Sequence, residues 1–264
     1  MINAKCCICG TVKDCAPYLE KVFQNIETIG KIFQDYKIII SYDKSQDNSY
    51  SFLINYQNNN PEKFILHTGN EPLTNFRVHN IAKARNACLD IIRNQFSDYE
   101  YFIMIDCDEV NIEPVRLEYI LYYLKINTEW DAITFNKEPY YDLWALSKYP
   151  YCFSCMHFKN WKQWGEFIKK IIEETPPKTL IPCLSAFNGF GIYRTNKFID
   201  GFYDPTVRLD LLPKHLLTAT EQASKSKLYL EGKAAKVDCE HRSFHLMAIN
   251  KHNARIRIAP EIIF

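Results

Sequence analysis

Two aspartates separated by one residue, Asp106 and Asp108, directly follow an uninterrupted apolar run at residues 101–105. A run without polar positions predicts a strand that is buried on both faces. In α/β sheets, ligands bind outside the carboxyl ends of such strands. Hard divalent cations such as Mn²⁺ or Mg²⁺ prefer oxygen ligands, and they neutralise the charge that builds on a departing diphosphate. The alternative is an acidic turn, since Asp-x-Asp is common by chance.

Two basic residues, Lys83 and Arg85, precede the acidic pair by about twenty positions in the segment Ala-Lys-Ala-Arg-Asn. The segment lies within a helical pattern at residues 75–96. The planar guanidinium of Arg85 is suited to binding phosphate oxygens. A solvated helix face is the alternative interpretation of these charges.

The elements that must position these side chains alternate along the first hundred residues. Apolar runs predict strands, 3.6-residue periodicity predicts helices, and their alternation predicts a parallel sheet with helices on both faces. The loops after Gly10, Tyr42 and Ile105 should therefore share one edge of that sheet. The expected strands are residues 4–10, 36–42, 63–67 and 101–105, and the expected helices are 17–33, 51–56 and 75–96.

The second half of the chain is less regular. Residues 130–135 and the alternating run 254–258 are candidate strands, and residues 140–158 are rich in aromatic side chains. We expect this half to complete a mixed, mainly parallel central sheet and to form the acceptor side of the site. The expected organisation is one α/β domain over residues 1–264, with a nucleotide-binding half (1–110) and an acceptor-side half (111–264).

The composition sets the class of protein. With 264 residues, 47% hydrophobic content and a formal net charge of +1, the chain suits one large soluble domain and gives no electrostatic case for a nucleic-acid or membrane-surface partner. We find no signal peptide and no apolar stretch of the ~20 residues that a spanning helix needs, so we expect a cytoplasmic location.

The 10 cysteines are expected to be buried free thiols in a reducing compartment. Two Cys-x-x-Cys pairs, 6/9 and 152/155, raise the alternative of structural zinc. The first pair lies on a predicted strand, where side chains three apart point to opposite faces, which is poor geometry for chelation.

The order of strand, helix with Ala-Arg-Asn, strand and Asp-x-Asp resembles the nucleotide-binding half of GT-A glycosyltransferases, a Rossmann-like fold. Further segments resemble the fungal capsule-type mannosyltransferase group and its viral relatives, and the resemblance extends over about residues 4–260. These segments are YDKSQD (42–47), YDLWAL (141–146), NGFGIYR (188–194) and CEH (239–241).

The resemblance implies roles for five residues of the first half. Thr11 and Asp43 would contact the nucleoside, and Arg85 would contact the diphosphate or sugar of the donor. Asp108 would be the direct ligand of Mn²⁺ or Mg²⁺. Asp106 would bind the ribose or reach the metal through water.

The resemblance also implies that His241 is a late third metal ligand, and neutral imidazole suits Mn²⁺. Glu240 is the candidate base that deprotonates the acceptor hydroxyl if the transfer inverts. If these two neighbours lie on a strand, they point apart and cannot both face the site. Rival ligands are His245 and His252, and alternative bases are Asp142, Asp204 and Asp210.

Acceptor contacts are expected from Trp144, Asn188 and Gly189. Aromatic faces stack on sugars, although so dense an aromatic stretch is also typical of a core. Glycine in Asn-Gly-Phe-Gly lets the backbone approach a ligand closely, and a tight turn is the alternative.

Taken together, the sequence predicts a metal-dependent glycosyltransferase that uses a UDP- or GDP-sugar donor and a glycan or glycoprotein acceptor. A nucleotidyltransferase is one alternative, but residues 10–13 supply only one glycine for a triphosphate loop. A non-enzymatic sugar- or protein-binding module is another, and it would not need Asp106 and Asp108.

Overall fold

The computed structural model describes residues 2–69, 73–232 and 237–264. The chain divides into two compact units, each made of separated segments. The first unit comprises Met1–Ile126, Gly189–Ile199 and Ile263–Phe264, and the second comprises Asn127–Asn188 and Asp200–Ile262. The single domain with halves 1–110 and 111–264 stays a prediction.

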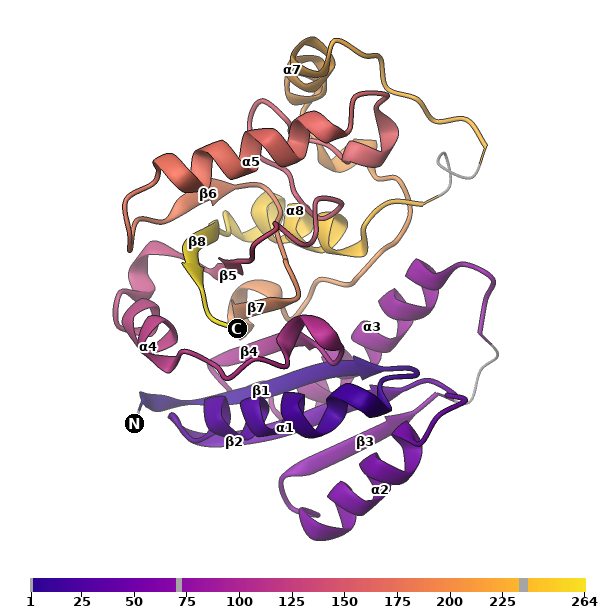
Figure 1. Cartoon of the computed structure of the whole chain (residues 1–264), viewed down its shortest axis with the longest axis vertical. Helices are drawn as coiled ribbons and strands as arrows, with labels where there is room; N and C mark the ends of the chain where they lie inside the picture. Colours follow the sequence, from indigo (N-terminus) through magenta and orange to yellow (C-terminus); the bar gives the residue numbers. More distant parts are fainter. Residues whose placement is uncertain (1, 70–72, 233–236) are drawn as a thin grey trace. The chain divides into compact units, whose positions relative to one another are not determined.

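Five strands of the first unit follow the order β3-β2-β1-β4-β7 (Figure 1). β1 pairs in parallel with both β2 and β4, β2 pairs in parallel with β3, and β7 is antiparallel to β4. The predicted strands at 4–10, 36–42, 63–67 and 101–105 are confirmed. Their bounds are β1 (Ile2–Val12), β2 (Phe33–Tyr42), β3 (Phe64–Thr68), β4 (Tyr101–Asp106) and β7 (Phe190–Arg194).

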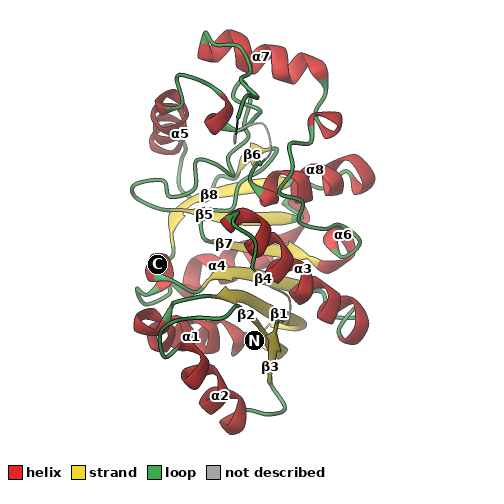
Figure 2. Cartoon of the chain, turned by 90° about the vertical axis from the view of Figure 1, so that its right-hand side faces the viewer, coloured by secondary structure: helices red, strands yellow, loops and turns green. Residues whose placement is uncertain are grey.

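The helices of the first unit cover both faces of its strands. Figures 1 and 2 show α1 and α3 on opposite faces of β1 and β2. α1 has Pro17 in its first turn, where the missing N–H leaves no hydrogen bond unmade. These helices are α1 (Ala16–Gly30), α2 (Ser49–Asn59), α3 (Arg77–Gln95), α4 (Leu117–Lys125) and α6 (Thr195–Phe198), with a 3₁₀ turn, η1 (Glu109–Asn111).

The second unit has three strands in the order β5-β8-β6, with β5 parallel and β6 antiparallel to β8. Within the two units, four strand pairs are parallel and two are antiparallel, which confirms a mixed, mainly parallel α/β fold. The bounds are β5 (Ala132–Asn136), β6 (Ile181–Cys183) and β8 (Ile256–Ile262), with α5 (Lys162–Glu174), α7 (Lys214–Ser224), α8 (Glu240–His252) and the 3₁₀ turns η2 (Asn127–Glu129), η3 (Cys155–His157) and η4 (Leu209–Leu211).

The condition that would separate Glu240 from His241 is not met. Glu240 and His241 do not lie on a strand, because they form the first turn of helix α8 after Cys239. Successive residues of a helix are about 100° apart, so the alternation of a strand does not separate them.

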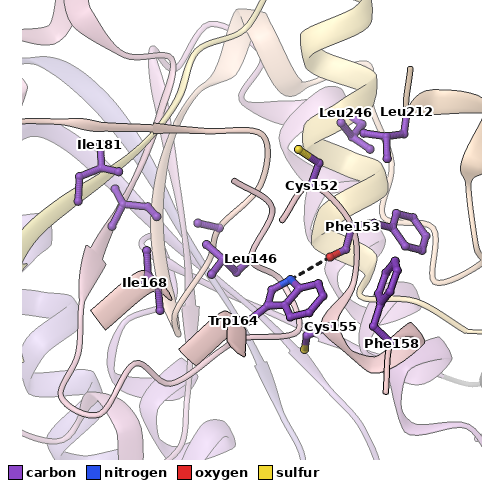
Figure 3. Packing of buried hydrophobic residues seen from close by; sticks show 12 residues of the cluster. Leu146, Cys152, Phe153, Cys155, Phe158, Trp164, Ile168, Ile181, Leu212 and Leu246 are labelled. Atoms are coloured by element: carbon purple, nitrogen blue, oxygen red, sulfur yellow. Dashed lines mark hydrogen bonds between the residues drawn. The ribbon is translucent and has the colours of Figure 1, made fainter. Parts of the chain in front are cut away.

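The aromatic stretch of the second half builds the core of the second unit (Figure 3). Phe153 and Trp164 are fully buried, and the indole N–H of Trp164 donates to the carbonyl oxygen of Phe153 at 3.1 Å. The core interpretation is therefore confirmed for these rings. Members of the cluster are Leu146, Cys152, Phe153, Cys155, Phe158, Trp164, Ile168, Ile181, Ala186, Leu212, Leu246 and Ile258.

The ten cysteines are free thiols, and nine of them are buried, as predicted. Burial raises the pKa of the Cys15 thiol to about 11, so the thiolate is disfavoured there. Across the described residues, none of the helices is sufficiently long and apolar to traverse a bilayer.

Candidate functional site

The register of the sheet brings three predicted residues of the first unit to one edge. Thr11 of β1 is the register partner of both Ser41 in β2 and Asp106 in β4. Asp43 follows β2 directly, and its backbone N–H donates to the carbonyl oxygen of Val12 at 2.9 Å. The carboxyl ends of these parallel strands therefore share an edge, as the sequence predicted.

Asp106 forms an ion pair with Arg85 of α3, with 2.8 Å between guanidinium Nη2 and carboxylate Oδ1. The side chain of Arg85 is 5% exposed and that of Asp106 is 17% exposed. The solvated-face interpretation is therefore wrong for Arg85, because its guanidinium is buried, whereas Lys83 on the same helix is exposed. Arg85 balances the charge of Asp106 at the end of β4.

Asp108 begins the turn η1, and its Oδ1 accepts a hydrogen bond from the backbone N–H of Val110 at 3.3 Å. Burial raises the pKa of the Asp108 carboxyl, and the neighbouring charge of Glu109 adds to that rise. The N–H of Val110 and the charge of Arg77 act in the opposite direction. The charged form of Asp108 is thus penalised by lost solvation, which a bound cation would relieve.

Asp43 is a second carboxylate at this edge. Burial raises its pKa, while the charges of Lys83, Lys13 and His67 lower it, in that order. Positive charge from the loop after β1, through Lys13, and from helix α3, through Lys83, therefore reaches the same edge as the carboxylates. Such charge is what a diphosphate requires.

The loop after β1 and the loop after β2 are joined by hydrogen bonds. Asp47 accepts from the backbone N–H of Ala16 through Oδ2 (2.8 Å) and from that of Ser49 through Oδ1 (2.9 Å). Asp14 donates its backbone N–H to Ser45 Oγ at 2.9 Å. Asp47 therefore caps the start of α1, a role that the sequence analysis missed although Asp47 lies within the segment 42–47.

Gly10 allows the acidic segment to pack against β1. A Cβ at this position would lie 2.5 Å from Cys107 Sγ and 3.1 Å from Ile40 Cδ1. Cys107, which lies between the two aspartates in the sequence, is buried. Glycine is thus required here by the close approach of Cys107.

His241 and Glu240 are both buried in the second unit. The imidazole of His241 stacks on Phe187, with ring centroids 3.8 Å apart and an interplanar angle of 18°. Its Nε2 lies 3.9 Å from Glu240 Oε1. Burial raises the pKa of the Cys239 thiol, and the charges of Glu240 and Asp142 add to that rise.

Asn188 has internal partners for its amide. Its Oδ1 accepts from the backbone N–H groups of Tyr141 (2.8 Å) and Asp142 (3.0 Å), and its Nδ2 donates to the carbonyl oxygen of Phe135 at 2.9 Å. Its φ of 58° lies in the left-handed region, as the tight-turn interpretation requires. Asn188 therefore shapes the segment that carries Asp142.

A buried arginine that the sequence analysis missed, Arg242, fixes the segment that carries Trp144. It donates to the carbonyl oxygens of Trp144 and Leu146, and its Nε pairs with Asp238 Oδ2 at 2.8 Å. Arg242 lies next to the segment 239–241, but the neighbouring residues give no signal of its burial.

The rival residues already have partners. His245 Nδ1 lies 2.9 Å from Ser185 Oγ, and His252 Nε2 lies 3.0 Å from Asp200 Oδ1. Asp204 and Asp210 both pair with Arg208.

The first unit thus contains Thr11, Asp43, Arg85, Asp106, Asp108 and Gly189, and the second contains Asp142, Trp144, Asn188, Glu240 and His241. Within residues 2–69, 73–232 and 237–264, no group of three or more His, Cys, Asp or Glu side chains is arranged to hold a metal ion. The role of His241 as a third ligand stays a prediction.

Comparison with known proteins gives structural likenesses only. No protein-family model matches the sequence, and no curated protein matches it. Similar solved structures include S. aureus TarS 1-349 in complex with UDP-GlcNAc, which is 12% identical with a TM-score of 0.48 over 98% of this chain and 57% of that one. Mannosyltransferase PcManGT from Pyrobaculum calidifontis, in complex with GDP-Man and Mn²⁺, is 12% identical with a TM-score of 0.45 over 98% and 57%.

A third similar structure is glucosyl-3-phosphoglycerate synthase from Mycobacterium tuberculosis, in complex with Mn²⁺, UDP and phosphoglyceric acid. It is 9% identical, with a TM-score of 0.44 over 74% of this chain and 57% of that one. The chain therefore spans less than two thirds of each of these structures. The narrower resemblance to the fungal capsule-type group and its viral relatives stays a prediction.

Proposed function

We propose that this chain is a metal-dependent glycosyltransferase of the GT-A kind that moves a sugar from a nucleotide-sugar donor to a hydroxyl acceptor. One observation carries the proposal. Asp106 and Asp108 stand at the carboxyl end of β4, where Asp106 is in register with Thr11 and ion-paired with the buried Arg85. Residues suited to a cation, a nucleoside and a phosphate thus gather at one strand-end edge.

The donor would be a UDP- or GDP-sugar bound along that edge. Thr11 would contact the nucleoside, and Asp43 would accept a hydrogen bond from its base or ribose. Lys83, whose charge lowers the pKa of Asp43, and Arg85 would face the diphosphate or sugar. Asp106 would bond the ribose.

The donor set fits Mn²⁺ or Mg²⁺, because Asp108 offers a hard oxygen whose charge is penalised by burial. Asp108 would hold the cation directly, with Asp106 reaching it through water and His241 as the proposed third ligand. The cation would supply counter-charge to the departing nucleoside diphosphate.

The acceptor chemistry would come from the second unit. In an inverting transfer, Glu240 or Asp142 would take the proton of the attacking hydroxyl as it forms the new glycosidic bond. Trp144, Asn188 and the backbone at Gly189 would shape the surface for a glycan or glycoprotein acceptor. The cytoplasmic location also remains a proposal.

Neither alternative function is favoured by a specific observation. β1 continues through Thr11 and Val12 in strand geometry, so the segment proposed for a triphosphate loop is largely strand. Of the aromatic residues that a sugar-binding module would display, Phe153 and Trp164 are core, whereas Tyr141, Tyr149 and Trp161 are exposed.

The test is a screen of nucleotide sugars for Mn²⁺-dependent hydrolysis, since transfer to water does not require the acceptor. Asp108→Asn keeps the shape and the cap to Val110 but removes the charge, so we expect hydrolysis to fall by about 10²–10³. Asp98→Asn is the matched control, because Asp98 is an exposed carboxylate of the same unit that pairs with Lys5. Wild-type turnover by Asp108→Asn at limiting Mn²⁺, or no metal-dependent hydrolysis by the wild type with any donor, contradicts the proposal.

A further inference from the structure

Two buried asparagines tie the acidic segment to the rest of the first unit. Asn111, at the end of η1, is fully buried. Its Nδ2 donates both hydrogens, to the carbonyl oxygens of Asp106 (2.8 Å) and Gly189 (2.9 Å). The backbone N–H of Asp106 also donates to Gly189 O at 2.9 Å. The backbone of Asp106 is therefore fixed on both its N–H and its carbonyl side.

The second asparagine, Asn25, reaches the same segment from helix α1. Its Nδ2 donates to the carbonyl oxygens of Asn111 (2.8 Å) and Glu113 (2.7 Å), and its Oδ1 accepts from the N–H of Val115 at 3.1 Å. One side chain thus closes three backbone hydrogen bonds of the chain that follows Asp108. We call Asn25 and Asn111 the asparagine latch.

Burying the two side chains of the asparagine latch lowers the free energy of unfolding. Asn25 sits among the buried apolar residues of α1, where an aliphatic side chain is the usual occupant. Asn111 Oδ1 is buried and has no hydrogen-bond partner among the residues that the structure describes. A buried acceptor left unpaired costs about 1–3 kcal/mol. The two asparagines therefore fix the geometry of the backbone they contact, and they are poorly suited to stabilising the fold.

We infer that Asn25 and Asn111 are positioning residues that hold the turn of Asp108 in the orientation required for a divalent cation, an inference that rests on the proposed function. They act through the backbone of the segment and do not touch the cation or the donor. Loss of the Asn111 amide frees the carbonyl oxygen of Asp106, before Asp108, and loss of the Asn25 amide frees backbone groups after it, so in either case the carboxylate of Asp108 samples more orientations. Removing groups that orient a metal ligand typically weakens metal binding by about 10–100-fold.

The experiment compares Asn25→Ala with Leu53→Ala. Leu53 is fully buried on α2 of the same unit, so its truncation costs stability without touching the latch. Mn²⁺ affinity is measured by calorimetry with the metal alone. Hydrogen exchange of the Asp106 and Asn111 amides is measured in the metal-free proteins, because neither amide donates to Asn25.

We expect Asn25→Ala to weaken Mn²⁺ binding at least tenfold and to accelerate exchange of both amides, whereas Leu53→Ala changes the Mn²⁺ affinity less than twofold. Equal losses in the two variants, or an unchanged affinity in Asn25→Ala, overturn the inference. If Asn25→Ala does not fold, Asn25→Ser, which keeps a small donor and acceptor, is measured in the same way.

The outcome separates this inference from the proposed function. A wild-type protein that binds no Mn²⁺ overturns the proposed function and the cation-orienting role together. The hydrogen-exchange result then still decides the latch, because unchanged exchange of Asp106 and Asn111 in Asn25→Ala shows that the amide does not hold the segment.

Discussion

The ion pair between Arg85 and Asp106 should contribute measurably to the stability of the first unit. Arg85→Met removes the charge while keeping an unbranched side chain in the interior of α3. Asp106→Asn removes the opposite charge with little change of shape. The two changes and their combination form a double-mutant cycle that isolates the pair.

The magnitude follows from the burial of the two groups. Two unit charges about 4 Å apart attract by roughly 4 kcal/mol at an effective dielectric constant of about 20. Removing one partner of a buried pair typically costs about 3–5 kcal/mol. Because the Asp106 side chain is 17% exposed, water screens part of this charge, and we expect each single change to cost about 2–3 kcal/mol.

The assay is urea unfolding of the four proteins without metal or nucleotide. We expect the double variant to be less destabilised than the sum of the single variants, by about 2 kcal/mol of coupling. The exposed pair Lys5–Asp98, with 2.9 Å between its charged atoms, is the control cycle, and solvent should leave it only weakly coupled. An Arg85–Asp106 coupling no larger than that of the control would show that the buried guanidinium does not balance the Asp106 carboxylate.

Three further outcomes follow from the site. Gly10→Ala should reduce Mn²⁺-dependent hydrolysis about tenfold or more, because the added Cβ would lie 2.5 Å from Cys107 Sγ. Adding Cys107→Ala to this variant should restore part of the rate. An unchanged rate in Gly10→Ala, or no restoration in the double variant, contradicts the role of this contact. Asp108→Asn should raise the free energy of unfolding at pH 7 by about 0.5–2 kcal/mol, since burial holds the pKa of Asp108 in the folded protein above its unfolded value. Below about pH 4 the carboxyl is protonated in both states, so this gain should vanish. Thermal unfolding across that pH range is the measurement. If His241 is a ligand, Mn²⁺ affinity measured by calorimetry should fall as the pH drops through about 6.5, and His241→Ala but not His245→Ala should remove that dependence.

The strands could be predicted because sheet burial leaves a direct trace in the sequence. The run at 101–105 is apolar at every position and the run at 36–42 at most positions, since the side chains of both strands are largely buried. Parallel pairing then sends their carboxyl ends to one edge, so the shared edge of the loops after Gly10, Tyr42 and Ile105 followed from the pattern, whereas the register of Asp106 with Thr11 did not.

Helix α8 could not be predicted in the same way. All of its first seven residues are buried, including Glu240, His241 and Arg242, so polar side chains occupy inward positions and no apolar stripe emerges. Periodicity identifies a helix only when one of its faces meets water. Burial of polar residues removed that contrast, and the segment resembled neither element clearly.

The burial of Arg85 could not be predicted from the sequence either. An Ala-Lys-Ala-Arg-Asn segment has the same composition whether the arginine faces solvent or a carboxylate 21 positions later, since 106 − 85 = 21. Asn25 did leave a signal, because it falls between Val22, Ile26 and Ile29 on the apolar face of α1. A polar residue on an otherwise apolar stripe indicates a buried partner, although it does not identify that partner.

Different surroundings suit the two carboxylates of the Asp-x-Asp pair to different roles. Asp106 has its charge balanced by Arg85 and its backbone held by Asn111 and Gly189, so it is a neutralised and rigid group. The carboxylate of Asp108 accepts a 3.3 Å hydrogen bond from the backbone N–H of Val110, and burial penalises its charge. A cation gains most where a carboxylate lacks compensation, and a ribose hydroxyl gains most from a fixed acceptor. The same environment that destabilises Asp108 in the free protein therefore makes it the stronger candidate for the metal, and Asp106 the stronger candidate for the nucleoside.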